Sequence, residues 1–205
     1  MKSIAVSLLA VLCTASAQEL KPPTRAFPPV GDKLTADDRT ALAAELAKVE
    51  KEFAALPKKK DNANAEIFLK AVRYALDYSE FYKPEDVASA KALLAEASSR
   101  IASLKKGEAP WMTAKGYVVR GYYSPIDGSA QPFGMEIPED APAKGAPAWV
   151  WLQGRGETRT DLHFLAERMK KGGQFKPPGT VIVHAWGRYC VGTKNAGEQE
   201  VVNVR

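Results

Sequence analysis

The residues with the clearest capacity for chemistry are Gly154-Arg155-Gly156, which separate an almost wholly apolar run at 148–152 from a helical pattern at 161–169. An apolar run without polar alternation is typical of a buried strand that is covered on both faces. A second such run follows at 180–186, and strand, helix and strand together predict a right-handed crossover in a parallel sheet. Ligands bind beyond the carboxyl ends of such strands, so we expect any site at 153–159 and 184–194. On spacing alone a plain strand-to-helix turn explains the Gly-x-Gly equally well.

A second glycine loop, residues 187–194, follows the second apolar run and nearly repeats a phosphate-binding P-loop. Its Thr193 and Lys194 stand in reversed order, however. This reversal moves the lysine by about 100° around the following helix, because consecutive helical residues are separated by that angle. The pattern therefore disfavours a nucleotide site.

The sequence patterns that could support metal binding or thiol chemistry are weaker than the glycine loops. His163 and Glu167 are four residues apart on one helix face, where they could ligate a metal together with His184 or Cys190. Local spacing supplies no reliable third ligand, so a surface pair on the helix is the favoured interpretation, and we expect no metal and no cofactor. Cys190 could serve as a thiol nucleophile beside His184, although its aromatic neighbours favour a buried, inert thiol.

The helices and strands around these residues can be predicted from composition and from the spacing of apolar residues. Residues 116–123 and 131–138 are rich in aromatic and β-branched side chains and flank the turn-forming segment 124–129, which predicts an antiparallel hairpin. Residues 35–107 instead show three amphipathic helical patterns. Thr35 caps the first helix, which ends near Pro57; the second covers about 63–78, and the third begins after Pro84 and stops at Gly107. This helical unit has no catalytic motif, which favours a packing or lid-like accessory.

The start of the chain predicts export. Residues 1–17 combine a positive end, an apolar segment and small residues before a cleavage site after Ala17, which is typical of a secretory signal. Residues 18–34 contain four prolines and predict an extended linker. No later stretch approaches the ~20 apolar residues of a membrane span, so we expect a secreted or periplasmic protein without an integral membrane segment. Cys190 would then be the one remaining cysteine, which excludes an intramolecular disulfide.

The net charge of +5 comes from basic residues that are interleaved with acids over most of the chain. Such mixing is typical of a solvated surface and not of a nucleic-acid interface. The one dense basic cluster, Lys58-Lys59-Lys60, lies between two helical patterns, where a solvated turn explains it.

Several of these segments resemble secreted bacterial hydrolases of the prolyl oligopeptidase-like group. The resemblance covers roughly residues 117–204 and is carried by residues 124–134, 151–157, 160–164, 184–190 and 196–198. It implies an α/β fold, namely the first half of an α/β-hydrolase sheet preceded by a small three-helix unit. Enzymes of that group use a Ser-His-Asp triad on an ester or peptide carbonyl. Their loop after the third strand often reads His-Gly-x-Gly, and its backbone N–H groups help to hold the oxyanion.

By this resemblance Gly154, Arg155 and Gly156 occupy the oxyanion loop, with Gln153 in place of the usual histidine. No G-x-S-x-G motif occurs in the sequence. Because the triad follows the order Ser, Asp or Glu, His, all three residues would lie beyond Arg205. We therefore expect the N-terminal portion of an exported serine hydrolase, a peptidase or carboxylesterase, with no catalytic residue in this chain.

The expected organisation is a signal at 1–17, a linker at 18–34, a helical unit at 35–107 and a partial hydrolase domain at 115–205. The expected partner is a peptide or ester substrate, without nucleic acid, and the oligomeric state is left open. We also expect the run 180–186 to lie at an exposed edge of the sheet, where it would promote association. The alternative is a non-catalytic exported interaction module that uses the helical region to bind a partner.

Overall fold

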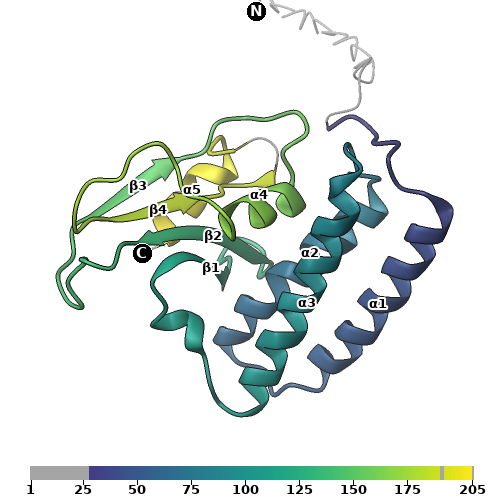
Figure 1. Cartoon of the computed structure of the whole chain (residues 1–205), viewed down its shortest axis with the longest axis horizontal. Helices are drawn as coiled ribbons and strands as arrows, with labels where there is room; N and C mark the ends of the chain where they lie inside the picture. Colours follow the sequence, from purple (N-terminus) through teal and green to yellow (C-terminus); the bar gives the residue numbers. More distant parts are fainter. Residues whose placement is uncertain (1–27, 190–191, 205) are drawn as a thin grey trace, which may run out of the picture.

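The computed structural model describes residues 28–189 and 192–204. The predicted signal, most of the predicted linker and Cys190 lie outside these residues. Figure 1 shows a helical half and a sheet half packed against each other.

The helical half contains the three predicted helices, α1 (Ala36–Ala54), α2 (Ala63–Asp77) and α3 (Glu85–Lys105). The hydroxyl of Thr35 accepts a hydrogen bond from the backbone N–H of Asp38 at 3.1 Å, which confirms the predicted cap of α1. Short 3₁₀ helices, η1 (Lys60–Asn62) and η2 (Pro110–Met112), precede α2 and the sheet. No helix in the described ranges is both long and apolar enough to cross a membrane.

The sheet half is a mixed α/β arrangement. Its strands are β1 (Gly116–Tyr123), β2 (Ala130–Ile137), β3 (Ala148–Leu152) and β4 (Val181–Ala185), in the order β1-β2-β4-β3. The β1–β2 and β2–β4 pairs are antiparallel, whereas β3 and β4 are parallel and are connected through α4 (Asp161–Arg168). The predicted hairpin and the predicted strand–helix–strand unit are therefore confirmed. A last helix, α5 (Ala196–Asn203), follows β4.

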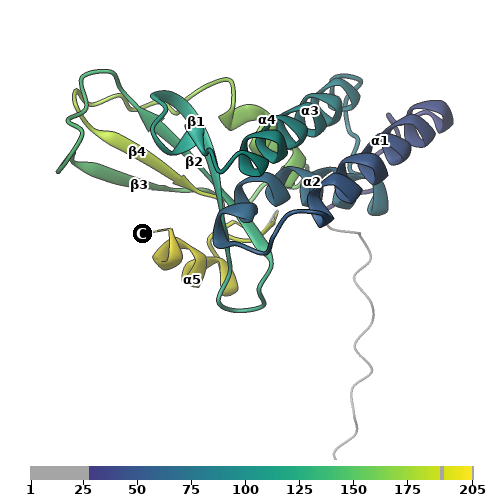
Figure 2. The same cartoon turned by 90° about the horizontal axis from the view of Figure 1, so that it is seen from below.

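Helices cover both faces of this sheet. On one face, glycines allow helices to approach closely: a side chain at Gly121 would collide with the backbone of Ala63 on α2, and one at Gly134 would collide with Arg168 on α4. Strand residues alternate between faces, so Tyr122 points to the opposite face, where its hydroxyl reaches Glu200 of α5. Figure 2 shows α5 on the side of the sheet away from α2 and α4.

One hydrophobic core joins the two halves. It runs from Leu42 of α1 through Phe68 of α2 to Phe164 of α4 and Trp186 after β4, all at most 1% exposed. The rings of Phe164 and Trp186 stack with centroids 4.7 Å apart. The helices are therefore part of the same core as the sheet.

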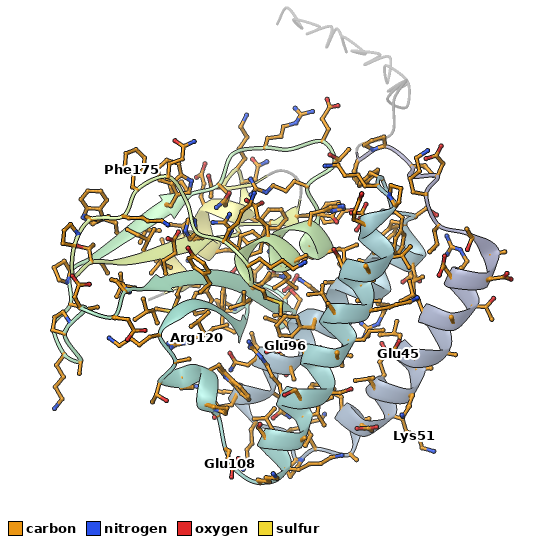
Figure 3. All side chains as sticks on the ribbon, in the orientation of Figure 1. Glu45, Lys51, Glu96, Glu108, Arg120 and Phe175 are labelled. Carbon is orange, nitrogen blue, oxygen red and sulfur yellow. The ribbon has the colours of Figure 1, made fainter. Side chains whose placement is uncertain are left out.

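The two apolar runs have environments opposite to those expected. The run at 148–152 forms β3, which is exposed along its whole length, so the prediction of a strand covered on both faces was wrong. The run at 180–186 is not an exposed edge, because β4 lies between β2 and β3 and is mostly buried. The reason is the strand order: among the described residues β3 has a partner strand on one side only, and the helices pack over β1 and β2. Phe175, labelled in Figure 3, contacts the ring of Trp151 at a centroid distance of 5.3 Å.

Candidate functional site

The Gly-x-Gly loop begins directly after β3, at the carboxyl end of the parallel strand pair. Gly154 and Arg155 are exposed, and open space surrounds the position of a side chain at Gly154. In the described part of the chain, the backbone N–H groups of Gly154 and Gly156 donate to no protein acceptor. The loop can therefore present backbone donors to a ligand.

The side chain of Gln153 anchors the start of this loop to the sheet. This side chain is buried, and its Nε2 lies 3.3 Å from Nδ1 of His184 on β4. The other ring nitrogen of His184, Nε2, lies 2.6 Å from Oε1 of Glu136 on β2. A neutral His184 that donates from Nε2 to the carboxylate and accepts at Nδ1 from the Gln153 amide satisfies both contacts.

The surroundings of His184 favour this neutral form. Burial lowers the pKa of His184, and the nearby Arg168 guanidinium acts in the same direction, while the hydrogen bond with Glu136 opposes them. Glu136 also accepts a hydrogen bond from the backbone N–H of Gly173, which fixes the carboxylate. Glu136, His184 and Gln153 thus form a buried relay, which is a chain of hydrogen bonds that connects the middle of the sheet to the loop.

The loop after β4 packs against the same place. Gly192 has a left-handed φ of 67°, and a side chain there would lie 2.7 Å from the Gln153 carbonyl oxygen. The backbone N–H of Arg188 donates to the Gly192 carbonyl at 2.9 Å. In this segment, which resembles a P-loop in sequence, the glycines at 187 and 192 serve close backbone packing.

A buried carboxylate fixes that second loop. Glu200 of α5 is fully buried and accepts hydrogen bonds from the Tyr122 hydroxyl at 2.7 Å, the Ser124 hydroxyl at 2.6 Å and the Arg188 guanidinium at 2.6 Å. Burial alone raises the pKa of Glu200, but these donors outweigh burial and hold it below its usual value. Arg188 also pairs with Asp127 in the hairpin turn at 2.7 Å.

A cleft of about 720 Å³ lies between α2 and this carboxyl edge of the sheet. Lys70 and Tyr74 of α2 line one side, and Gln131 of β2 and Arg188 line the other. At its base the Nζ of Lys70 forms an ion pair with Asp161, at the start of α4, at 2.9 Å, and both side chains are almost completely buried. The cleft thus occupies the position at which sheets of this kind bind ligands.

A further buried acid lies where the helical half meets α4. Glu80 is fully buried between α2 and α3. Burial raises the pKa of Glu80 to about 7, the neighbouring Thr160 hydroxyl opposes this rise, and the charge of Asp161 adds to it. Glu80 therefore titrates near neutral pH.

His163 and Glu167 have separate partners and do not form the expected surface pair. The Nε2 of His163 lies 3.2 Å from the Asp86 carboxylate of α3, and its ring stacks on Tyr82. Glu167 pairs with Arg159 and Arg168. The reason is that α3 packs beside α4 and brings a carboxylate to the histidine. Within residues 28–189 and 192–204, no group of three His, Cys, Asp or Glu side chains could hold a metal ion.

Sequence reasoning missed the buried acids Glu80, Glu136 and Glu200. Glu136 shares with Gly134 the face of β2 that α4 covers, and this placement depends on the fold and not on a local pattern. Comparisons with protein-family models, curated proteins and solved structures gave no match. Function is therefore inferred from the residues and their geometry.

Proposed function

We propose that this chain is the N-terminal portion of an exported serine hydrolase of the α/β-hydrolase type, a peptidase or carboxylesterase. In this proposal Gly154, Arg155 and Gly156 form the oxyanion loop, and the nucleophile, acid and base lie beyond Arg205. The observation that carries the proposal is the pair of backbone N–H groups at Gly154 and Gly156, which lie at the carboxyl end of a parallel strand and have no acceptor within residues 28–189 and 192–204.

The chemistry of such a loop is electrostatic. When a nucleophile attacks an ester or amide carbonyl, negative charge develops on the carbonyl oxygen, and fixed N–H donors stabilise it. Loss of one such donor typically lowers kcat by about 10²–10³. The donors must be held in place before the reaction, and the buried relay of Glu136, His184 and Gln153 supports this requirement.

The strand order gives further support. An antiparallel pair followed by a parallel crossover agrees with the resemblance to the start of an α/β-hydrolase sheet. Trp149 and Trp151 point to one face of β3 and Val150 and Leu152 to the other, and all four are 41–55% exposed. Such a pattern is typical of an interior strand, so we propose that a further strand pairs with β3.

The proposal predicts that the 205-residue chain has no hydrolase activity, because it contains no G-x-S-x-G nucleophile motif. The test is to produce this chain and the longer open reading frame side by side. Both are assayed with p-nitrophenyl acetate and with a fluorophosphonate probe that labels activated serines.

We expect turnover and labelling by the long form alone, and loss of both when its labelled serine is changed to alanine. Turnover by the 205-residue chain would contradict the proposal. A long form that is folded and contains the motif but is inactive would favour the interaction module.

A further inference from the structure

The cleft between α2 and the sheet edge has features that the oxyanion loop does not explain. Its volume of about 720 Å³ lies within the ~300–1,000 Å³ range of small-molecule sites. The helical half supplies one complete wall, through Lys70, Tyr74, Asp77 and Tyr78. A ligand in the cleft would therefore contact both halves of the molecule.

The charges in this cleft are largely neutralised within the protein. Lys70 is paired with Asp161, and Arg188 is paired with Glu200 and Asp127. The ionic lining residues are two cations and three carboxylates, the third being Asp77. Among the described lining residues an anionic ligand would find no unpaired cation and would face excess negative charge, so the cleft favours an uncharged ligand.

Hydrogen bonds fix the floor of the cleft before any ligand enters. The Ser129 hydroxyl donates to Asp127 at 2.6 Å, and the Gln131 amide donates to Ser129 at 2.7 Å. Lys70 approaches the Gln131 carbonyl oxygen at 3.5 Å, which continues the chain of polar groups to Asp161. Carboxylates, a hydroxyl and an amide in fixed positions can bind the hydroxyl groups of a ligand.

Aromatic rings provide the complementary surface. Tyr74 and Tyr78 lie edge to face, with centroids 5.6 Å apart and an interplanar angle of 73°. Tyr78 is 59% exposed. A tyrosine ring offers an apolar face at little entropic cost, and the C–H face of a sugar ring packs well against it.

The backbone at the rim is also unusual. Ser79 and Tyr189, which line the cleft, have left-handed φ values of 54° and 49°. Such conformations are costly for residues other than glycine and cluster at ligand sites. Tyr189 belongs to the loop that packs through Gly192 against Gln153 and Gly154, so the cleft adjoins the candidate oxyanion loop.

We infer that this cleft binds a neutral carbohydrate. An uncharged ligand with many hydroxyl groups and apolar C–H faces matches the neutralised charges, the fixed polar floor and the tyrosine wall. Binding does not depend on the hydrolase proposal. A role for the cleft as the subsite for an esterified sugar does rest on it.

The test is calorimetric titration of the 205-residue chain with xylohexaose, cellohexaose and mannohexaose. Tri-alanine and oligogalacturonate serve as peptide and anionic probes. We expect at least one neutral oligosaccharide to bind more tightly than either of these. Tyr78→Ala should weaken that binding roughly threefold to tenfold, the cost of losing one aromatic contact.

Tyr117→Ala is the matched control, because Tyr117 is also an exposed tyrosine but lines a different cavity, near Lys176 and Pro177. Thermal unfolding of each variant establishes that it is folded. The inference is overturned if no neutral oligosaccharide binds, if oligogalacturonate or tri-alanine binds better, or if Tyr78→Ala and Tyr117→Ala bind alike. If the 205-residue chain binds sugar but the long form has no hydrolase activity, the carbohydrate inference stands and the hydrolase proposal is excluded.

Discussion

Glu80 shows how one buried side chain links stability to pH. In the unfolded chain its carboxyl group titrates near 4.5, whereas in the folded protein its pKa is about 7. The native state therefore retains this proton more strongly. The stability that the proton confers is fully present below about pH 4.5 and is lost as the pH rises to about 7.

Glu80→Gln should remove this dependence, because glutamine is neutral at every pH. Above pH 7 we expect the variant to be more stable than the wild type by up to about 3 kcal/mol, the upper limit set by the pKa difference. Urea unfolding between pH 4.5 and 8 measures the effect. Glu45→Gln, at an exposed residue of α1 that is labelled in Figure 3, is the control and should follow the wild type. If the free energy of unfolding of Glu80→Gln and of the wild type changed with pH in the same way, the raised pKa of Glu80 would be contradicted.

Gln153 gives the second prediction at this scale. Gln153→Met keeps the size of the side chain but removes the contact with His184 Nδ1. We expect a loss of about 1 kcal/mol in the free energy of unfolding, the usual net value of a buried hydrogen bond. Amide hydrogen exchange at Arg188, whose N–H donates to the Gly192 carbonyl in the loop packed against Gln153, should become faster, because that loop loses its anchor. Gln199→Met, at an exposed position of α5, should change neither quantity.

Helices and strands were the most predictable part of the molecule. The helices over 36–105 and the hairpin over 116–137 follow from period, caps and turn residues, which are local signals. The environments of β3 and β4 were not predictable in this way. Val150 and Val183 lie opposite each other in similar apolar runs, yet one is half exposed and the other is buried. Strand order decides this difference, and strand order depends on contacts far apart in the sequence.

The same limit explains why the acids of the site were missed. Glu200 reads as an ordinary polar residue of an amphipathic helix, beside Glu198. Only the fold brings Tyr122, Ser124 and Arg188 to it. The glycine loop at 154–156, in contrast, was located from the sequence because it directly follows a strand.

Glu200 also provides the prediction for α5. Glu200→Ala leaves the Tyr122 and Ser124 hydroxyls and the Arg188 guanidinium without their shared acceptor, so we expect a loss of about 3–5 kcal/mol. Hydrogen exchange should show α5 and the loop after β4 losing protection before the core helices. Glu198→Ala, two residues away and exposed, should cost less than about 0.5 kcal/mol. Equal effects of the two variants would contradict the role of Glu200.

At the scale of the whole molecule, the shared core predicts one cooperative unfolding transition. Circular dichroism reports mainly on the helices, whereas tryptophan fluorescence reports on residues 111, 149, 151 and 186, the last three of which lie in the sheet half. Phe164→Ala should lower both midpoints together, at a cost of about 3–5 kcal/mol, because the side chain is fully buried against Trp186. Phe175→Ala removes a half-exposed ring and should cost less than about 1 kcal/mol. Separate midpoints for the two signals would mean that the halves unfold independently.

The edge of β3 predicts self-association of the 205-residue chain. Its apolar side chains, and the backbone edge that no strand of the described residues covers, offer a surface on which another strand can pair. Val150→Lys with Leu152→Lys should shift the molecule toward the monomer in analytical ultracentrifugation, since charges at an edge oppose pairing. Val202→Lys, which changes an exposed valine on α5, is the control. Unchanged association in the double variant would exclude β3 as the contact surface.

The burial of α2 has a consequence for how fast a ligand can enter the cleft. Ile67, Phe68, Leu69, Ala71 and Val72 are completely buried, so the helix that forms the cleft wall cannot swing away as a lid without breaking the core. A ligand would therefore meet a wall that is already in its final position. Association should follow a single exponential whose rate increases linearly with ligand concentration, without the plateau that a preceding opening step would impose.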